Sequence, residues 1–569
     1  MILVLAIAAA LTWYPSEQWR DAPDPDADSR ARKGGTIRFN GSQSPKSLNA
    51  YVDNNSYTAM TFDLMYDRLL GMDSKTLDFI PQLARRWAVS ADGSEFVFEI
   101  DDRARWSDGV PVSAHDVKWT FDTVMDPAND TGPWKTVLGF FESPEVIDDR
   151  TVRFRKKDAQ KKDWRDILNC STFWILPKHA FEGRSFNSVS MQGLPVSGSY
   201  RVEKVEEQIE TVFARVDGWW RGDFPSCRNT CNFDRIVMRY HASNENAFES
   251  LKARKIDVYP VYTARIMAEQ TRGDRFDRNW ILKRRIRNHR PIGFQAFAMN
   301  TRRKPFDDLR VRKAMAMLID RETMNRTMMS GAYFLLNSFY TDLYSQSNPC
   351  TNTLYRYDVA EAKRLLADAG YANGFEFTFL SRSSSEDKFL SLFSHALEQC
   401  GIKMNIDRKD FAGWMRDMDS FNFDMTWQSW GASLIRTPEI MWSSKEADRQ
   451  GSNNTVGFKS SEVDAIIEEE RQMTDMAERA AAYRRIDAII ASACPYAFLW
   501  QSDSSRILYW NKFGMPETVF SRHGDERCIF TYWWYDPDKA AELEEAVSTG
   551  GFLPAVPYEV DYGKFRGNR

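Results

Sequence analysis

Cysteine and histidine are the side chains of this sequence that could most directly act as nucleophiles, bases or metal ligands. The seven cysteines stand at positions 170, 227, 231, 350, 400, 494 and 528, and their odd number leaves at least one free or joined to another molecule. In the segment SCRNTC, Cys227 and Cys231 are close enough to close a small loop, which an oxidising compartment would allow. The six histidines are never within four residues of one another, which argues against a local histidine metal site but leaves open one assembled from distant segments.

The sequence patterns that usually mark enzymes are missing. There is no G-x-S-x-G nucleophile elbow, no phosphate loop with Gly-Lys-Ser/Thr, no H-E-x-x-H and no C-x-x-C. The 76 basic residues nearly balance the 80 acidic ones, giving a net charge of -4 that does not suggest a nucleic-acid partner. We therefore expect no catalytic residue, no cofactor, no resident metal and no bound nucleic acid.

The elements that must position a binding site divide into two patterns. With 569 residues the chain is too long for one ordinary core, so two or more lobes are expected. The first half favours hairpins: SEFVFEI (94–100) and RTVRFR (150–155) alternate, and Ser113-Ala-His-Asp116 opens a helix with a variant of the capping box. A further helix is predicted before them, ending at Gly71.

From Asn300 onwards helices and strands alternate. Asp307-Asp308 is predicted to begin one helix and Asp358 to cap another, strands are expected at 376–380 and 403–407, and Ser461 opens a long helix reaching about Ala493. This order favours an α/β lobe with a largely parallel or mixed sheet. The acidic helix AAELEEAVSTGG and the polar segment to Arg569 are predicted to form a surface tail.

The first fourteen residues are apolar and have the length of a signal-peptide core, too short to span a bilayer. Ala8-Ala9-Ala10 offers small residues for cleavage, and because no cysteine precedes Cys170 no lipid anchor is expected. Residues 15–33 are polar and predict a flexible lead. We expect an exported, soluble, periplasmic protein; the alternatives are a short buried strand or an uncleaved anchor.

A succession of segments from about Gly34 to about Asp538 carries a family resemblance. It comprises KGGTIRFNGSQSPKSLNAY, PQLARRWAVSADGSEFVFEIDDRARWSDGVPVSAHDVKWTFD, LPVSGSYRVEKV and NTRRKPFDDLRVRKAMAMLIDRETM. In this order they resemble the class C, family 5 solute-binding proteins of ABC importers, which include oligopeptide-binding proteins. ETMNRTMMSGAYFLLNSFY and WWYDPDKAAEL look most like the YejA branch, whose members serve the uptake of peptides and peptide antibiotics.

The resemblance implies an α/β, two-lobed periplasmic binding protein of type II (class C) with an extra subdomain in the first lobe. The expected parts are a signal and lead at 1–33, lobe I from 34–75, 190–295 and 505–540, the extra subdomain at 76–189, lobe II at 296–504 and a C-terminal tail at 541–569. Such proteins capture a solute between their lobes by hinge closure. They deliver it to ABC permease subunits in the membrane, and a monomer is expected.

The resemblance also indicates where a ligand contacts the chain. In relatives the equivalent of FDMTWQSWGAS turns into the cleft, so that Trp414, Trp427, Trp430 and Gly431 would line it; the alternative for each tryptophan is core packing. Aromatic walls would offer a ligand apolar area and stacking without requiring one particular side chain. Asn300 at the start of the second lobe, and Asn40 with Tyr51 nearer the N-terminus, are weaker candidates.

One position departs from the family pattern. Oligopeptide binders of the enteric type carry an aspartate three residues after this tryptophan, which pairs with the ligand's α-ammonium group; here the position is Ser433. Glu439 could replace it, or could be a solvated loop acid. A ligand blocked at its amino terminus, or one that is not a peptide, therefore stays open.

Several functions remain as alternatives. The same fold binds sugars, opines, nickel chelates and murein peptides, and the YejA-like segments favour a peptide among them. A secreted hydrolase would need a nucleophile and a base, and neither is visible. A regulator would carry an N-terminal DNA-binding domain, but the residues before the fold have no helix-turn-helix pattern.

Overall fold

A computed structural model describes residues 11–14 and 22–562, apart from residues 42, 43, 45, 46, 54, 55, 162, 189, 190, 242, 263, 346 and 474. The chain divides into two compact units. Unit 1 comprises Met1–Thr263, Thr271–Asn288 and Ser505–Arg569, and unit 2 comprises Ala264–Gln270 and His289–Ser504. Residues 264–270 and 289–295, which are expected in lobe I, group with unit 2.

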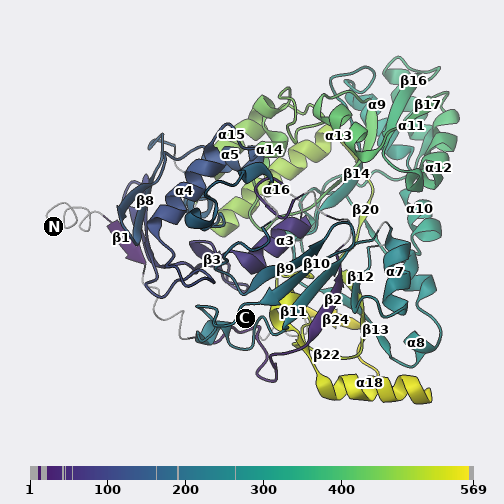
Figure 1. Ribbon diagram of the computed structural model, residues 1–569. Helices are drawn as coiled ribbons and strands as arrows, with labels where there is room; N and C mark the ends of the chain where they lie inside the picture. Colours follow the sequence, from purple (N-terminus) through teal and green to yellow (C-terminus); the bar gives the residue numbers. More distant parts are fainter. Residues whose placement is uncertain are drawn as a thin grey trace. The chain divides into compact units, whose positions relative to one another are not determined.

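Unit 1 is built around an eight-stranded mixed sheet with the order β24-β13-β21-β12-β2-β11-β10-β9. Its strands are β2 (Thr36–Asn40), β9 (Tyr200–Glu206), β10 (Glu210–Arg215), β11 (Arg235–Arg239), β12 (Val258–Pro260), β13 (Ile281–Arg287), β21 (Ser505–Trp510) and β24 (Glu559–Asp561). Strand β2 pairs in parallel with both β11 and β12, so the sheet joins segments that lie far apart in the sequence. Helices α7 (Asn244–Lys252) and α8 (Asp274–Asp277) connect some of these strands (Figure 1).

The region expected as an extra subdomain belongs to unit 1 and supplies four strands of a five-stranded antiparallel sheet ordered β1-β5-β6-β8-β7, whose edge strand β1 comes from the N-terminal segment. The strands are β1 (Leu11–Tyr14), β5 (Ala84–Ser90), β6 (Glu95–Ile100), β7 (Glu145–Asp148) and β8 (Thr151–Arg155). Helix α4 (Ala114–Met125) begins where the capping box predicted, because the Asp116 carboxylate accepts a hydrogen bond from the backbone N–H of Ser113. One hydrophobic core runs from this sheet into the large one.

The structure describes only the last part of the apolar N-terminal run, residues 11–14. Residues 1–10, with the three alanines proposed for cleavage, lie outside the described residues. Leu11–Tyr14 form the edge strand β1 against β5, and the ring of Tyr14 stacks on that of Trp87 with centroids 5.6 Å apart. These four residues thus form a strand, but not the buried one of the alternative, because each of them is half-buried or exposed.

Two predictions for unit 1 were wrong. The helix expected to reach Gly71 is α3 (Ser56–Met65), and Gly71 lies in the hairpin of β3 (Leu70–Met72) and β4 (Phe79–Pro81). The C-terminal segment is not only a surface tail: after α18 (Pro537–Thr549), strand β24 pairs in parallel with β13 and completes the large sheet.

Unit 2 contains the predicted α/β alternation, with a five-stranded mixed sheet ordered β17-β16-β18-β14-β19. The strands are β14 (Phe294–Met299), β16 (Glu376–Ser381), β17 (Lys403–Arg408), β18 (Met425–Trp430) and β19 (Tyr496–Phe498). Two hydrophobic clusters lie on its faces, one containing Phe297 and Phe379 and the other containing Phe294 and Leu380. Because neighbouring residues of a strand point to opposite faces, strands β14, β16, β18 and β19 contribute to both clusters.

The helices of unit 2 mostly begin where their caps predicted. Asp308 and Asp358 accept hydrogen bonds at the N-termini of α9 (Leu309–Met317) and α11 (Val359–Asp368). The others are α10 (Arg321–Met328), α12 (Asp387–Glu398), α13 (Phe411–Asp419) and α14 (Pro438–Trp442). The long helix expected from Ser461 is two helices, α15 (Ser461–Glu470) and α16 (Met476–Ala493), because Asp475 caps a new N-terminus by accepting from two backbone N–H groups.

All seven cysteines are free thiols in the structure, so Cys227 and Cys231 do not form the small disulfide loop that their spacing allowed. Cys350 is partly exposed and the other six are buried. Among the described residues, no helix combines the length and the apolar character needed to cross a membrane.

Candidate ligand-binding site

Strand β18 carries two of the predicted site tryptophans and directs them to opposite faces of the unit 2 sheet. Trp427 is paired with Phe297, and Trp430 is paired with Phe294 on the neighbouring strand β14. The two tryptophans are three residues apart, an odd spacing that reverses side-chain direction in a strand. They cannot line the same wall of a binding site.

Trp427 and Trp414 are both core residues of unit 2. The Trp427 ring lies 5.3 Å from that of Phe389 and 5.6 Å from that of Phe297. Trp414, from α13, donates its indole N–H to the hydroxyl of Thr426 on β18 at 2.9 Å. With 9% and 7% of their surfaces exposed, Trp427 and Trp414 position the sheet and the helix rather than offering a face to solvent.

Trp430 is half-buried, and its indole is held by a buried polar network. Its N–H donates to the side-chain oxygen of Gln428 at 2.9 Å. Gln428 in turn donates to the hydroxyl of Thr455 at 3.0 Å and accepts from that of Tyr496 at 3.2 Å. Burial raises the pKa of Tyr496, so the network stays uncharged. The indole thus has a fixed orientation on an electrically neutral support.

The chain after Trp430 is open. Gly431, Ala432 and Ser433 are exposed, and a Cβ at Gly431 would have no atom within 4 Å. The backbone N–H groups of these three residues donate no hydrogen bond to any part of the chain that the structure describes. Since three consecutive free donors follow an aromatic surface, this exit from β18 can receive the main chain of an extended ligand.

A glycine just before the neighbouring strand β14 sets the position of this exit. A Cβ at Gly293, just before β14, would lie 1.9 Å from the carbonyl oxygen of Trp430. Only glycine allows the two backbones to approach so closely. Gly293 and the Gln428 network were missed in the sequence because their roles arise from pairing with distant segments.

The two polar candidates near this exit differ in how they are engaged. The Ser433 hydroxyl accepts from the backbone N–H of Ile435 at 3.2 Å and is otherwise exposed. Glu439, on α14, forms an ion pair with Arg471 at 3.7 Å, and both side chains are mostly buried. Glu439 therefore already faces a cation within unit 2, one that it shares with Glu468 at 2.8 Å, and is not a ready substitute for an ammonium-binding aspartate.

The three remaining candidates serve the interior of their own units. Asn300 is fully buried and donates to the carbonyls of Phe421 and Phe423. In unit 1, buried Asn40 shares a hydrogen bond of 2.9 Å with the ring of His241. Tyr51 is buried among aromatic rings and donates to the carbonyl of Trp174. None of these three residues therefore shares an exposed surface of its own unit with Trp430.

Within the described residues, the structure shows no group of three histidine, cysteine, aspartate or glutamate side chains able to hold a metal ion.

The sequence matches a known protein family over most of this framework. Residues 78–452, which include β14, β18 and the exit after Trp430, match the bacterial extracellular solute-binding proteins, family 5 (middle region). The chain belongs to this family. The resemblance seen in the sequence is therefore confirmed at the level of the family.

Relatives of this family 5 protein share its length and about a quarter of its residues. It is 25% identical to the YejA protein of Escherichia coli (strain K12) over 569 residues, covering 91% of this chain and 92% of that protein. It is also 25% identical over 547 residues to a protein of Agrobacterium fabrum named "Probable peptide-binding protein YejA", covering 86% of this chain and 88% of that one.

Solved structures show the same fold with different ligands. The DppA periplasmic binding protein of Helicobacter pylori, in complex with the peptide STSA, gives a TM-score of 0.73 at 19% identity and covers 89% of this chain and 99% of that one. AgaA of Agrobacterium tumefaciens R10, in complex with agropinic acid, gives a TM-score of 0.69 at 19% identity and covers 88% of this chain and 99% of that one. These likenesses confirm the predicted two-lobed type II fold of α/β class.

Proposed function

We propose that this family 5 solute-binding protein captures a peptide outside the cytoplasmic membrane and delivers it to an ABC importer. The observation that carries the proposal is the exit from β18, where the fixed indole of Trp430 is followed by three free backbone donors at 431–433. An aromatic face accepts many side chains, and main-chain hydrogen bonds recognise the feature that all peptides share.

The proposal includes a preference for peptides without a free amino terminus at this exit. Ser433 stands where a carboxylate would hold an α-ammonium group, and Glu439 is paired with Arg471. An unpaired ammonium group would lose hydration there without gaining a partner of opposite charge. Peptides that are blocked, or whose amino terminus extends beyond the site, therefore bind best.

The experiment is a titration of the purified protein with peptides of two to ten residues, each in free and N-acetylated form, followed by tryptophan fluorescence. Mass spectrometry of any co-purified solute runs beside it. We expect saturable binding that falls by tenfold or more, about 1.4 kcal/mol or more, in Trp430→Ala. Trp119→Ala is the matched control, because it removes another half-buried indole from unit 1.

The outcomes separate the alternatives. Saturable binding lost only in Trp430→Ala supports the peptide receptor. Binding of a sugar, an opine or a metal chelate in place of every peptide would overturn the peptide assignment and keep the family. Consumption of a bound peptide during the titration would instead favour a hydrolase.

Capture by closure of two lobes, as in the family resemblance, is part of the same proposal. The polypeptide passes from one unit to the other after residues 263, 270, 288 and 504. Small-angle scattering should then show a smaller radius of gyration with the ligand than without it. An unchanged radius at saturating ligand would contradict closure without contradicting binding.

A further inference from the structure

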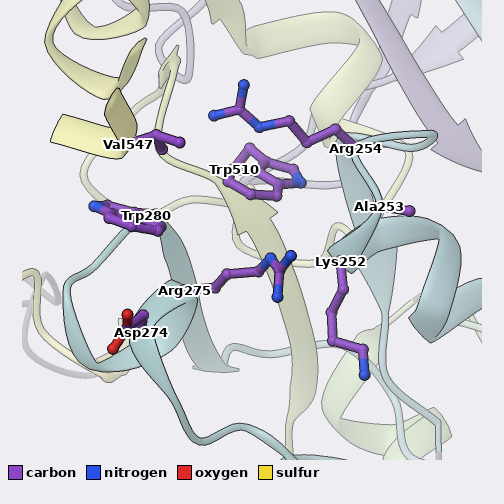
Figure 2. Close-up of a pocket in the computed structure, with 8 residues that line it drawn as sticks. All are labelled: Lys252, Ala253, Arg254, Asp274, Arg275, Trp280, Trp510 and Val547. Atoms are coloured by element: carbon purple, nitrogen blue, oxygen red, sulfur yellow. The ribbon is translucent and has the colours of Figure 1, made fainter. Parts of the chain in front are cut away.

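A cavity in unit 1, far along the chain from the exit of β18, has a different chemical character. Its volume is about 390 Å³, within the range of small-molecule sites. Figure 2 shows three cationic side chains around it, Lys252, Arg254 and Arg275, together with one acid, Asp274, and two indoles, Trp280 and Trp510. The proposed peptide receptor makes no use of these groups.

The two indoles are fixed by hydrogen bonds from their edges to the backbone. Trp510, at the end of β21, donates to the carbonyl of Leu251 at 2.8 Å. Trp280 donates to the carbonyl of Gly551 at 2.9 Å, and Asn279 beside it donates to that of Leu553 at 2.9 Å. The segment after α18 is thereby held against the start of β13. Both indoles line the cavity, but most of each ring is packed inside unit 1: 9% of the surface of Trp280 and 3% of that of Trp510 stay exposed.

Two of the three cations already have partners. Arg254 forms two hydrogen bonds with the carboxylate of Glu544, at 2.9 and 3.0 Å, while its guanidinium lies 4.6 Å above the Trp510 ring. Lys252 is paired with Glu249 at 2.6 Å.

Arg275 is the cation without a partner. Its neighbour Asp274 is directed to Arg278, at 3.4 Å. Arg275 itself is exposed and forms no ion pair or hydrogen bond with the part of the chain that the structure describes. Figure 2 shows its guanidinium pointing from α8 toward the middle of the cavity, between Trp280 and Lys252. One uncompensated positive charge therefore faces a space bounded by aromatic rings.

We propose that this cavity binds a small aromatic carboxylate. A guanidinium is a planar fork that matches a carboxylate through two parallel hydrogen bonds. A single uncompensated charge suits a monoanion better than a dianion. The ring of the ligand contacts the exposed part of Trp280, since Arg254 lies 4.6 Å above Trp510 whereas Arg278 lies 5.8 Å from the Trp280 ring, and Trp280 is the more exposed of the two indoles. This site lies in unit 1 alone and does not depend on the peptide assignment.

The test uses the whole protein labelled with 5-fluorotryptophan and followed by fluorine NMR. The resonances of Trp280 and Trp510 are assigned with Trp280→Phe and Trp510→Phe. Benzoate is titrated as the probe, with benzamide as the neutral analogue of the same shape and acetate as the carboxylate without a ring. Arg275→Gln removes the unpaired charge, and Arg272→Gln removes an exposed arginine three residues away that does not line the cavity.

We expect benzoate to shift the two assigned resonances saturably, and benzamide and acetate to bind at least tenfold more weakly. Arg275→Gln should weaken benzoate about tenfold, as for the loss of a charged hydrogen bond, and Arg272→Gln should leave it unchanged. If benzamide bound as tightly as benzoate, the charge of the ligand would have no role. If acetate bound as tightly as benzoate, the ring would have none. An absence of saturable shifts, or equal losses in both arginine variants, would overturn the site.

Discussion

The exit of β18 in unit 2 and the cavity of unit 1 both contain tryptophan. The side chains around the tryptophan are uncharged at the exit and cationic at the cavity. Trp430 is held by the uncharged side chains of Gln428, Thr455 and Tyr496, and it leads into free backbone donors. Trp280 and Trp510 are held by backbone carbonyls and face cationic side chains. The first arrangement suits a ligand recognised through its main chain, and the second suits a ligand recognised through its charge. The groups that hold an indole therefore indicate its ligand better than the indole itself.

The largest expected effect tests whether Trp280 and Trp430 contribute differently to the free energy of unfolding. Trp280→Ala removes a side chain that is 9% exposed and hydrogen-bonded to the segment after α18, so it should lower the free energy of unfolding of unit 1 by about 3–5 kcal/mol. Trp430→Ala should cost clearly less, because part of its ring already faces water. Urea denaturation monitored separately for each unit measures both. Equal costs would contradict the expectation that the more buried indole contributes more to the free energy of unfolding.

An intermediate effect is expected for a pair of glycines around the exit. Gly293→Ala places a Cβ against the Trp430 carbonyl, and overpacking of this kind typically costs about 1–3 kcal/mol. It should also weaken peptide binding, since Trp430 must shift. Gly431→Ala adds a methyl group to open space, so its unfolding free energy should stay unchanged. Unfolding and peptide titration of both variants test this, and a destabilised Gly431→Ala would contradict the open exit.

The smallest effect concerns the missing carboxylate. Ser433→Asp should strengthen the binding of peptides with a free amino terminus about tenfold, about 1.4 kcal/mol, through a charge-assisted hydrogen bond. N-acetylated peptides should bind as before. Calorimetric titration of both forms at neutral pH measures the ratio, and Ser433→Asn controls for size. If acetylated peptides also bound more tightly to Ser433→Asp, the amino terminus of the peptide would not lie at residue 433.

Local chemistry made much of this fold predictable. The caps at Ser113, Asp308 and Asp358 and the alternation after Asn300 are written in neighbouring residues, and the structure places helices and strands accordingly. The division of a helix and the pairing of distant strands were harder to predict from the sequence. The second cap at Asp475 divides an apparently continuous helix, and β24 joins a strand more than 270 residues earlier, a pairing without any local signature.

The candidate site was predictable in part for the same reason. We expected both Trp427 and Trp430 to line the cleft, although the period of a strand already separates them, because residues three apart point to opposite faces. The support of Trp430 could not be foreseen, since Thr455 and Tyr496 come from distant segments. The cationic cavity of unit 1 likewise assembles four separate stretches of chain. The role of each remaining candidate as a ligand contact stays a prediction until the titrations are made.

The strand order of unit 1 also determines the sequence of events as the chain folds. Every strand of the unit 2 sheet lies between residues 294 and 498, so that sheet can form from one continuous stretch. The unit 1 sheet cannot form from one continuous stretch, because β21 (505–510) lies between β12 and β13. The edges of β12 and β13 that face β21 stay unpaired until β21 is in place. A chain synthesised from its amino end therefore has unpaired strand edges until β21 is available, and unpaired edges favour aggregation.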